Sequence, residues 1–339
     1  MTRFLVPSKL GTMKTSEKII KYINSHEQVA GKELADFLGI TDRAVRKQFK
    51  SMLERGELLK FGKPPRVFYS LNRKKGKVQV LANALIIDKK IKRVIDENFV
   101  FISPRGKKIV GWEGFTQWCL RRSYDPTKKS QEYLRTYEKY EKFREDGYIS
   151  GKKKIKDTFH GNICLENVFY ADFYSWEVFG KTRLGQLLLH AKQNQDKKMM
   201  KEIFSQVKPI IEKVIKKYAI SAIGYIPPSV KREVQFMKVF QENLNISLPV
   251  VKIVKIKTDI VTPQKTLNKL EDRIENADVT LAVSENRSFE NVLLLDDAVG
   301  SGATLNQVAC KLKKSGVARK VFGFSITGSA KGFDVISEV

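Results

Sequence analysis

The sequence is poor in the residues that build disulfide frameworks and metal clusters. Its 339 residues include three cysteines (Cys119, Cys164 and Cys310) and three histidines. Because the cysteines are odd in number and far apart, we expect no disulfide framework and no zinc site, and a reducing cytoplasm as the location. No apolar run approaches the length of a membrane span, and the first residues lack the order of a signal peptide. These absences argue against a disulfide-stapled secreted protein and against a membrane-spanning one.

Acidic residues are scarce relative to basic ones. The chain has 63 Lys+Arg and 37 Asp+Glu, a net charge of +26. The first 150 residues alone carry 33 basic and 17 acidic residues, a net of +16. This balance favours a polyanionic partner that is bound through phosphate contacts. A lysine-rich proteome is the alternative origin of the charge.

Residues 16–72 have the pattern of three short helices followed by a β-hairpin that turns at 62–66. Thr41 can cap the third helix. This order, with the run Leu-Ala-Asp-Phe-Leu-Gly-Ile-Thr-Asp-Arg-Ala-Val-Arg, resembles the winged helix-turn-helix of bacterial transcriptional regulators. The resemblance implies that the third helix enters the DNA major groove, whereas a winged helix used only for protein contacts is the alternative. The implied DNA-binding residues are Arg43, Arg46, Lys47, Lys50, Lys63 and Arg66.

Residues 76–155 resemble no family, and we assign them no role. Apolar residues at helical spacing predict helices in this segment, and a small hairpin is expected at 99–110. Four aromatic residues recur at three- and four-residue intervals: Tyr133, Tyr137, Tyr140 and Phe143. Such a stripe suggests base stacking, but it is more typical of a packing face or an oligomer seam, so a homo-oligomer stays open. The basic run at 152–156 is interpreted as a solvated link.

Beyond residue 219, apolar strands, one of them expected at 279–283, alternate with helices, which is typical of a parallel α/β domain. The strand at 292–295 is followed directly by Asp296 and Asp297, then by the small-residue segment 298–304 and a helix. A buried strand followed by a plain turn does not need two adjacent acids, which are costly to bury unpaired. A strand, a glycine-containing loop and a helix N-terminus together predict a phosphate-binding cradle.

The same stretch resembles the fingerprint for 5-phosphoribosyl 1-diphosphate (PRPP) in type I phosphoribosyltransferases, whose fold is a Rossmann-like parallel α/β sheet. The resemblance implies that Asp296 and Asp297 are the catalytic residues that meet the ribose hydroxyls. Mg²⁺ is then expected near them, bound through PRPP and not directly by the protein. The residues implied to hold the 5-phosphate are Ala298, Val299, Gly300, Ser301, Gly302, Ala303 and Thr304.

The surrounding residues narrow the resemblance to ComF-like phosphoribosyltransferase domains over roughly 165–339. The segment 262–276 and the loop at 224–232 are similar to parts of that family. The resemblance places Lys231 and Arg232 near the diphosphate and implies a mobile loop with Gln264, Lys265 and Arg273. Two features depart from the family: its zinc-binding cysteines are absent, and its Arg-Gly-Phe-Asn reads Glu-Val-Gln-Phe at 233–236. The second substrate is therefore unassigned.

We therefore expect three parts: an α+β winged helix at 1–75, a middle segment at 76–155 and a phosphoribosyltransferase-like domain at 156–339. Two functions stay open for this architecture. The first is an enzyme acting on a nucleotide or base, favoured by the intact 262–276 segment. The architecture resembles winged-helix phosphoribosyltransferase effectors of retrons, which are anti-phage elements; this implies a reverse transcriptase and its RNA–DNA hybrid as partners. The second is a non-catalytic, PRPP-sensing regulator resembling Gram-positive purine repressors. Nucleic-acid packaging by charge alone does not explain the fingerprint.

Overall fold

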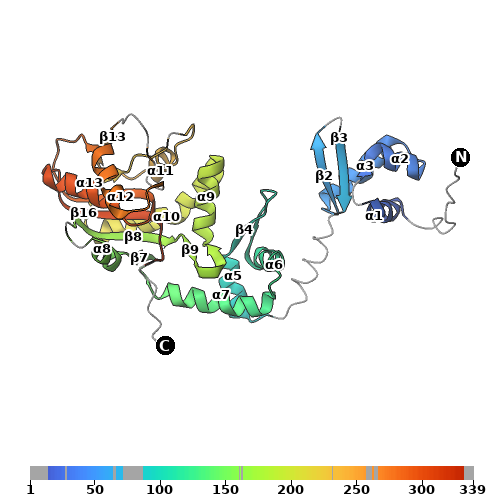
Figure 1. Ribbon diagram of the computed structural model, residues 1–339, viewed down its shortest axis with the longest axis horizontal. Coiled ribbons are helices and arrows are strands. Elements are labelled where there is room, and N and C mark those ends of the chain that lie inside the picture. Colours follow the sequence, from blue (N-terminus) through green and yellow to red (C-terminus); the bar gives the residue numbers. More distant parts are fainter. Residues whose placement is uncertain are drawn as a thin grey trace. The chain divides into compact units, whose positions relative to one another are not determined.

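The computed structural model describes residues 14–26, 29–63, 66–71, 87–159, 161, 163–230, 232–256, 262 and 266–331, with the backbone alone at 61–63 and 66. The chain divides into two compact units, Met1–Ile86 and Ile87–Val339 (Figure 1). We expected a separate middle segment at 76–155. Its described residues belong by their contacts to the second unit.

The first unit packs three helices against a three-stranded antiparallel sheet of order β1-β3-β2. The predicted cap of the third helix is present, because Thr41 Oγ1 accepts a hydrogen bond from the Ala44 amide at 3.3 Å. Fully buried side chains such as Ile23, Leu34 and Val45 form the core between helices and sheet. The elements are α1 (Thr15–His26), β1 (Val29–Ala30), α2 (Gly31–Leu38), α3 (Asp42–Glu54), β2 (Leu58–Lys63) and β3 (Arg66–Leu71).

The second unit begins with an aromatic-rich group of helices around a hairpin. Tyr133 and Tyr140 are each 2% exposed, and the Tyr133 ring lies 5.0 Å from that of Phe179 between centroids. The aromatic stripe is therefore a packing face within the chain. The elements are α5 (Lys89–Asn98), β4 (Val100–Ile102), β5 (Lys108–Val110), α6 (Gly111–Leu120) and α7 (Pro126–Glu141).

The rest of the unit is built on a seven-stranded, mostly parallel sheet of order β12-β11-β15-β16-β8-β7-β6. The strands from β12 to β8 pair in parallel, while β7 and β6 extend the sheet by antiparallel pairing. The strands are β12 (Val250–Val251), β11 (Ala222–Tyr225), β15 (Phe289–Val299), β16 (Ala318–Gly328), β8 (Leu165–Phe173), β7 (Tyr148–Ser150) and β6 (Arg144–Glu145).

Helices cover both faces of this sheet, which explains why the middle of its central strands, such as 292–295 of β15, is an unbroken apolar run. One face carries α9 (Arg183–Asn194), α10 (Lys197–Lys217) and α11 (Phe236–Leu244), which share a core with alternate residues of β15 and β16. The opposite face carries α13 (Ala303–Lys314), with α12 (Leu270–Thr280) packed against it, and α8 (Lys152–Thr158) (Figure 1). Between β8 and α9 lie β9 (Ser175–Trp176), a 3₁₀ turn at Glu177–Phe179 and β10 (Gly180–Lys181).

Two predictions about local structure were wrong. Residues 279–283 were expected to form a strand of the main sheet, but α12 continues to Thr280. Only β14 (Leu281–Val283) is extended, and it pairs antiparallel with β13 (Ile253–Lys255) in a separate sheet. The basic run at 152–156 is not a solvated link: it forms α8, whose Ile155 is 2% exposed and anchors the helix.

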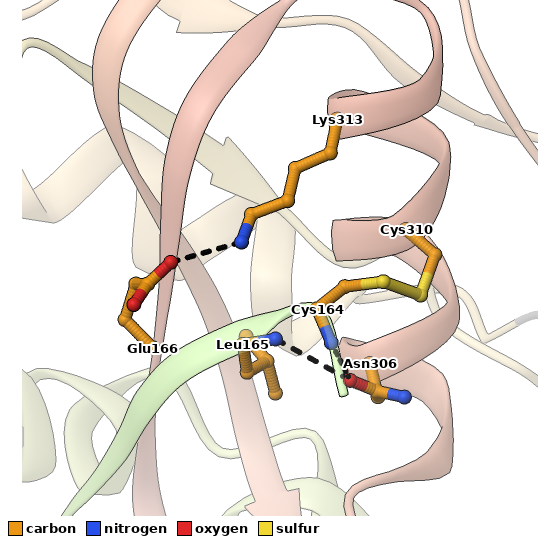
Figure 2. Close-up of a disulfide and its surroundings, with 6 residues drawn as sticks. All are labelled: Cys164, Leu165, Glu166, Asn306, Cys310 and Lys313. Carbon is orange, nitrogen blue, oxygen red and sulfur yellow. Dashed lines mark hydrogen bonds and ion pairs between the residues drawn. A yellow bond between two sulfur atoms is a disulfide. The ribbon is translucent and has the colours of Figure 1, made fainter. Parts of the chain in front are cut away.

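The expectation about the cysteines was also wrong. Cys164 and Cys310 form a disulfide with a Cα–Cα distance of 5.0 Å (Figure 2). Their separation of 146 residues hid this proximity, which arises because the start of β8 lies beside α13. Asn306 strengthens the junction by accepting a hydrogen bond from the Cys164 amide at 2.9 Å. The cysteine content therefore no longer argues for a reducing compartment.

Candidate functional site at the end of strand β15

The two adjacent acids lie within the last part of β15, not after its end as expected. The strand continues past them because β16 stays paired with it as far as Val299. On the other side, β11 ends at Tyr225, opposite Leu295. One edge of β15 is thus uncovered from Asp296 onward, and both acids line a cavity there.

Asp296 and Asp297 are in different environments because successive side chains of a strand point to opposite faces of the sheet. The Asp297 carboxylate forms an ion pair with Lys192 of α9. Asp296 accepts a hydrogen bond from the Asp297 amide at 2.7 Å. Burial, together with the negative charge of Asp297, raises the pKa of Asp296 to about 7. A bound cation would favour the ionised form of Asp296 and reverse this shift.

The loop that follows β15 turns at Gly302, whose φ of +86° lies in the left-handed region. A Cβ atom at this position would also lie 2.5 Å from Ile155 Cδ1, so glycine is needed for space as well as for conformation. Helix α13 begins at the next residue, and its Ala303 amide donates to Ser301 Oγ at 3.4 Å. The amides of a first helical turn lack partners within the helix and bind anions readily.

One cavity of about 600 Å³ joins the acids and this loop to two arginines. Arg232 donates to the main-chain carbonyl of Lys192. Arg273 Nε donates to the carbonyl of Leu267 at 2.8 Å. The predicted Lys231, Gln264 and Lys265 lie outside the described residues. The predicted residues that line the cavity are Arg232, Arg273, Asp296, Asp297, Ala298, Val299, Gly300, Ser301, Gly302, Ala303 and Thr304.

Sequence reasoning missed the side of the cavity that is formed by other elements. Lys192 precedes its partner Asp297 by 105 residues, on a helix in which no local pattern indicates a site. Tyr174 and Leu188 line the same side, and Lys255 of β13 lies on the wall with its ammonium donating to the Ser229 carbonyl at 2.8 Å. The fold alone brings these residues to the acids, and no local motif marks them.

The acid pair could bind Mg²⁺ only together with oxygen atoms that a bound ligand and water supply. No group of three or more Asp, Glu, His or Cys side chains that could hold a metal occurs among the residues whose placement is described. Mg²⁺ accepts such a partial set, because it commonly keeps waters and substrate phosphate oxygens beside one or two carboxylates. Asp296 and Asp297 are the carboxylates that would hold it.

The residues predicted to bind DNA lie on the first unit. Arg43, Arg46, Lys47 and Lys50 are exposed along α3, and Arg46 forms an ion pair with Asp42 at 2.5 Å. Lys63 and Arg66 face each other as a register pair where β2 meets β3, but their side chains are not described. The four α3 side chains therefore form a basic helical surface.

Comparisons with known proteins identify no family. No protein-family model matches the sequence, and no curated protein matches it. A crystal structure of a hypoxanthine phosphoribosyltransferase from Staphylococcus aureus is 12% identical, with a TM-score of 0.22, over 37% of this chain and 62% of that one. The matched part thus spans less than two thirds of that enzyme's chain, and at this score the similarity carries no argument.

The second unit is a mixed α/β structure with a large, mostly parallel sheet, which is compatible with a phosphoribosyltransferase-like fold. Within the described ranges, no helix is both long and apolar enough to cross a membrane.

Proposed function

We propose that the second unit binds PRPP, or a related ribose phosphate or nucleotide, together with Mg²⁺ in the cavity at the end of β15. The observation that carries the proposal is the meeting of three features in one cavity of about 600 Å³: an acid pair, a loop leading into a helix N-terminus, and two arginines. Carboxylates suit ribose hydroxyls and Mg²⁺, while amides and guanidinium groups suit phosphates. The ligand would thus need hydroxyls between two phosphorylated ends.

The proposed activity is transfer of the ribose 5-phosphate group to a nucleotide or base. In such a transfer the bond from the anomeric carbon to the diphosphate breaks, and a bond to the acceptor forms. Arg232 and Arg273 would stabilise the leaving diphosphate, and the amides of the 298–304 segment would hold the 5-phosphate. Mg²⁺, when bound, would supply charge neutralisation of the diphosphate. Asp296 and Asp297 would orient the ribose, which lowers the barrier by fixing the reacting carbon.

A second candidate is a PRPP sensor that performs no transfer. One observation favours it: the ion pair between Lys192 and Asp297 already neutralises one acid of the site. A ligand hydroxyl that bound Asp297 would displace Lys192 and thereby change the surroundings of α9. The departure from the family pattern at 233–236 also leaves the acceptor side without an assigned residue.

Nucleic acid is the partner that we propose for the first unit, through Arg43, Arg46, Lys47 and Lys50. Their exposure on one helix and the net charge of +26 support this proposal. An RNA–DNA hybrid, a reverse transcriptase and a role in a retron stay predictions that rest on overall architecture.

The experiment that separates the enzyme from the sensor uses the full chain with PRPP and Mg²⁺. Release of pyrophosphate in the presence of nucleobases or nucleotides would support transfer. Absence of turnover, combined with a PRPP-dependent change in affinity for a DNA, would support the sensor. A chain that shows neither turnover nor PRPP binding would contradict both candidates.

A further inference from the structure

A lysine is buried directly behind the 298–304 segment. Lys154 of α8 is 7% exposed, whereas its neighbours Lys152 and Lys153 are exposed. Lysine is seldom buried without a counter-charge, because removing the ammonium from water is costly. No carboxylate pairs with Lys154 among the described residues; its ammonium donates to the carbonyl of Ser329 at 3.1 Å. Among the residues that the structure describes, the charge of Lys154 therefore has no counter-charge.

Two contacts connect this cation to the phosphate-binding loop. Ser329 accepts from Lys154 through its carbonyl and donates through its amide to the carbonyl of Val299 at 3.0 Å. Since both groups belong to one residue, the ammonium lies within roughly 10 Å of the loop backbone. The next residue of α8, Ile155, packs so closely on Gly302 that a Cβ there would lie 2.5 Å from Ile155 Cδ1. Helix α8 thus packs directly against the 298–304 segment.

The pKa of Lys154 is that of an ammonium group whose charged form a bound anion would stabilise. Burial lowers the pKa of Lys154 to about 8, and the positive charge of Lys331 acts in the same direction. The fold thus holds, at a cost in stability, a charge that nothing described neutralises. A dianion placed on the amides of α13 would offset part of this cost, since attraction across low-dielectric protein is little screened by salt.

We propose that Lys154 is a positioning residue for the ligand's terminal phosphate: from behind the 298–304 segment, whose own residues carry no charge, it adds positive charge to that of Arg273, whose Nη1 lies 3.6 Å from the Cβ position of Gly300. The inference rests on the proposed function, because it assumes that the phosphate at this end of the cavity belongs to a ribose phosphate. It adds a residue outside the fingerprint and assigns a role to the basic run at 152–156. Lys154 acts through the loop and makes no contact with the ligand.

The test compares two isomeric sugars, ribose 5-phosphate and ribose 1-phosphate, in calorimetric titrations of the full chain. In Lys154→Met the affinity for ribose 5-phosphate should fall roughly tenfold, as expected for losing one charge at this distance. The affinity for ribose 1-phosphate, whose phosphate belongs at the other end of the cavity, should fall by a clearly smaller factor, about fourfold, because the attraction decreases with distance. Lys153→Met is the matched control, because it removes an exposed charge from the same helix. Lys154→Arg should restore most of the affinity for ribose 5-phosphate.

Three results would overturn the inference in recognisable ways. If Lys154→Met and Lys153→Met both bind ribose 5-phosphate as the parent does, Lys154 has no role in binding, while the proposed function stands. If Lys154→Met loses both sugars equally and melts at a lower temperature, its role is structural. If the parent binds neither sugar nor PRPP, the proposed function fails and the inference fails with it.

Discussion

Substituting Gly302 by alanine tests whether the phosphate-binding loop is built on α8. Two costs are expected. A non-glycine residue in the left-handed region costs about 1–2 kcal/mol, and φ at Gly302 is +86°. The new Cβ would lie 2.5 Å from Ile155 Cδ1 and 3.8 Å from Phe159 Cε2, and relieving such overpacking adds about 1 kcal/mol. We expect Gly302→Ala to lower the free energy of unfolding by about 2–3 kcal/mol.

Gly316 is the matched control for this substitution. It lies at the other end of α13 with a φ of +73°, and nothing lies within 4 Å of its Cβ position. Gly316→Ala should therefore show the conformational cost alone, in urea unfolding followed by circular dichroism. Ile155→Val, which removes the clashing methyl group, should recover about 1 kcal/mol when combined with Gly302→Ala but not with Gly316→Ala. Equal destabilisation by the two alanines, or no recovery, would refute the contact between loop and helix.

Three further predictions concern the disulfide, the half-buried Asp296 and the basic helix. Denatured protein should show one free thiol per chain before reduction and three after it, and three thiols before reduction would exclude the disulfide. Cys164→Ser should lower the free energy of unfolding of the oxidised protein by about 4 kcal/mol. Because the pKa of Asp296 is raised to about 7, unfolded protein binds fewer protons than folded protein between about pH 4 and pH 7, so stability should fall as pH rises through this window. Asp296→Asn should remove that fall and be about 2 kcal/mol more stable than the parent in urea unfolding at pH 8. Parallel curves of stability against pH for the two proteins would contradict the raised pKa. Arg43→Ala/Lys47→Ala should weaken DNA binding about tenfold and reduce the slope of log affinity against log salt concentration by about two. Lys18→Ala/Lys21→Ala on α1 should change neither quantity. An equal effect of both pairs in a filter-binding assay would contradict the assignment to α3.

The sequence predicted elements whose local signals are strong. Helix α2 ends at Leu38, directly before the left-handed Gly39, and α3 begins directly after its predicted cap, Thr41. The strand at 292–295 was recognised because an unbroken apolar run of this length is typical of a strand buried on both faces of a parallel sheet. The acids and the 298–304 segment were found in the same way, as a local motif. All of these features depend on residues that are close together in the chain.

Features that depend on distant residues could not be predicted. The disulfide joins residues 146 positions apart, and Lys192 meets Asp297 only because α9 packs beside the end of β15. Lys154 looked like part of a solvated run, because three lysines in a row usually face water. Its burial follows from the packing of α8 against β8 and of Ile155 against Gly302. Val279 misled the strand prediction because β-branched residues favour strands, yet its side chain is 54% exposed on α12.

The central claim is that PRPP binds at the end of β15, and direct titration of the full chain with PRPP and Mg²⁺ tests it. We expect saturable binding by the parent that weakens at least tenfold in Asp296→Asn/Asp297→Asn, since both carboxylates would contact the ribose or its Mg²⁺. Glu212→Gln/Glu242→Gln removes the same charge from exposed sites on α10 and α11 and should bind as the parent does. Binding that is equal in all three proteins would contradict the site.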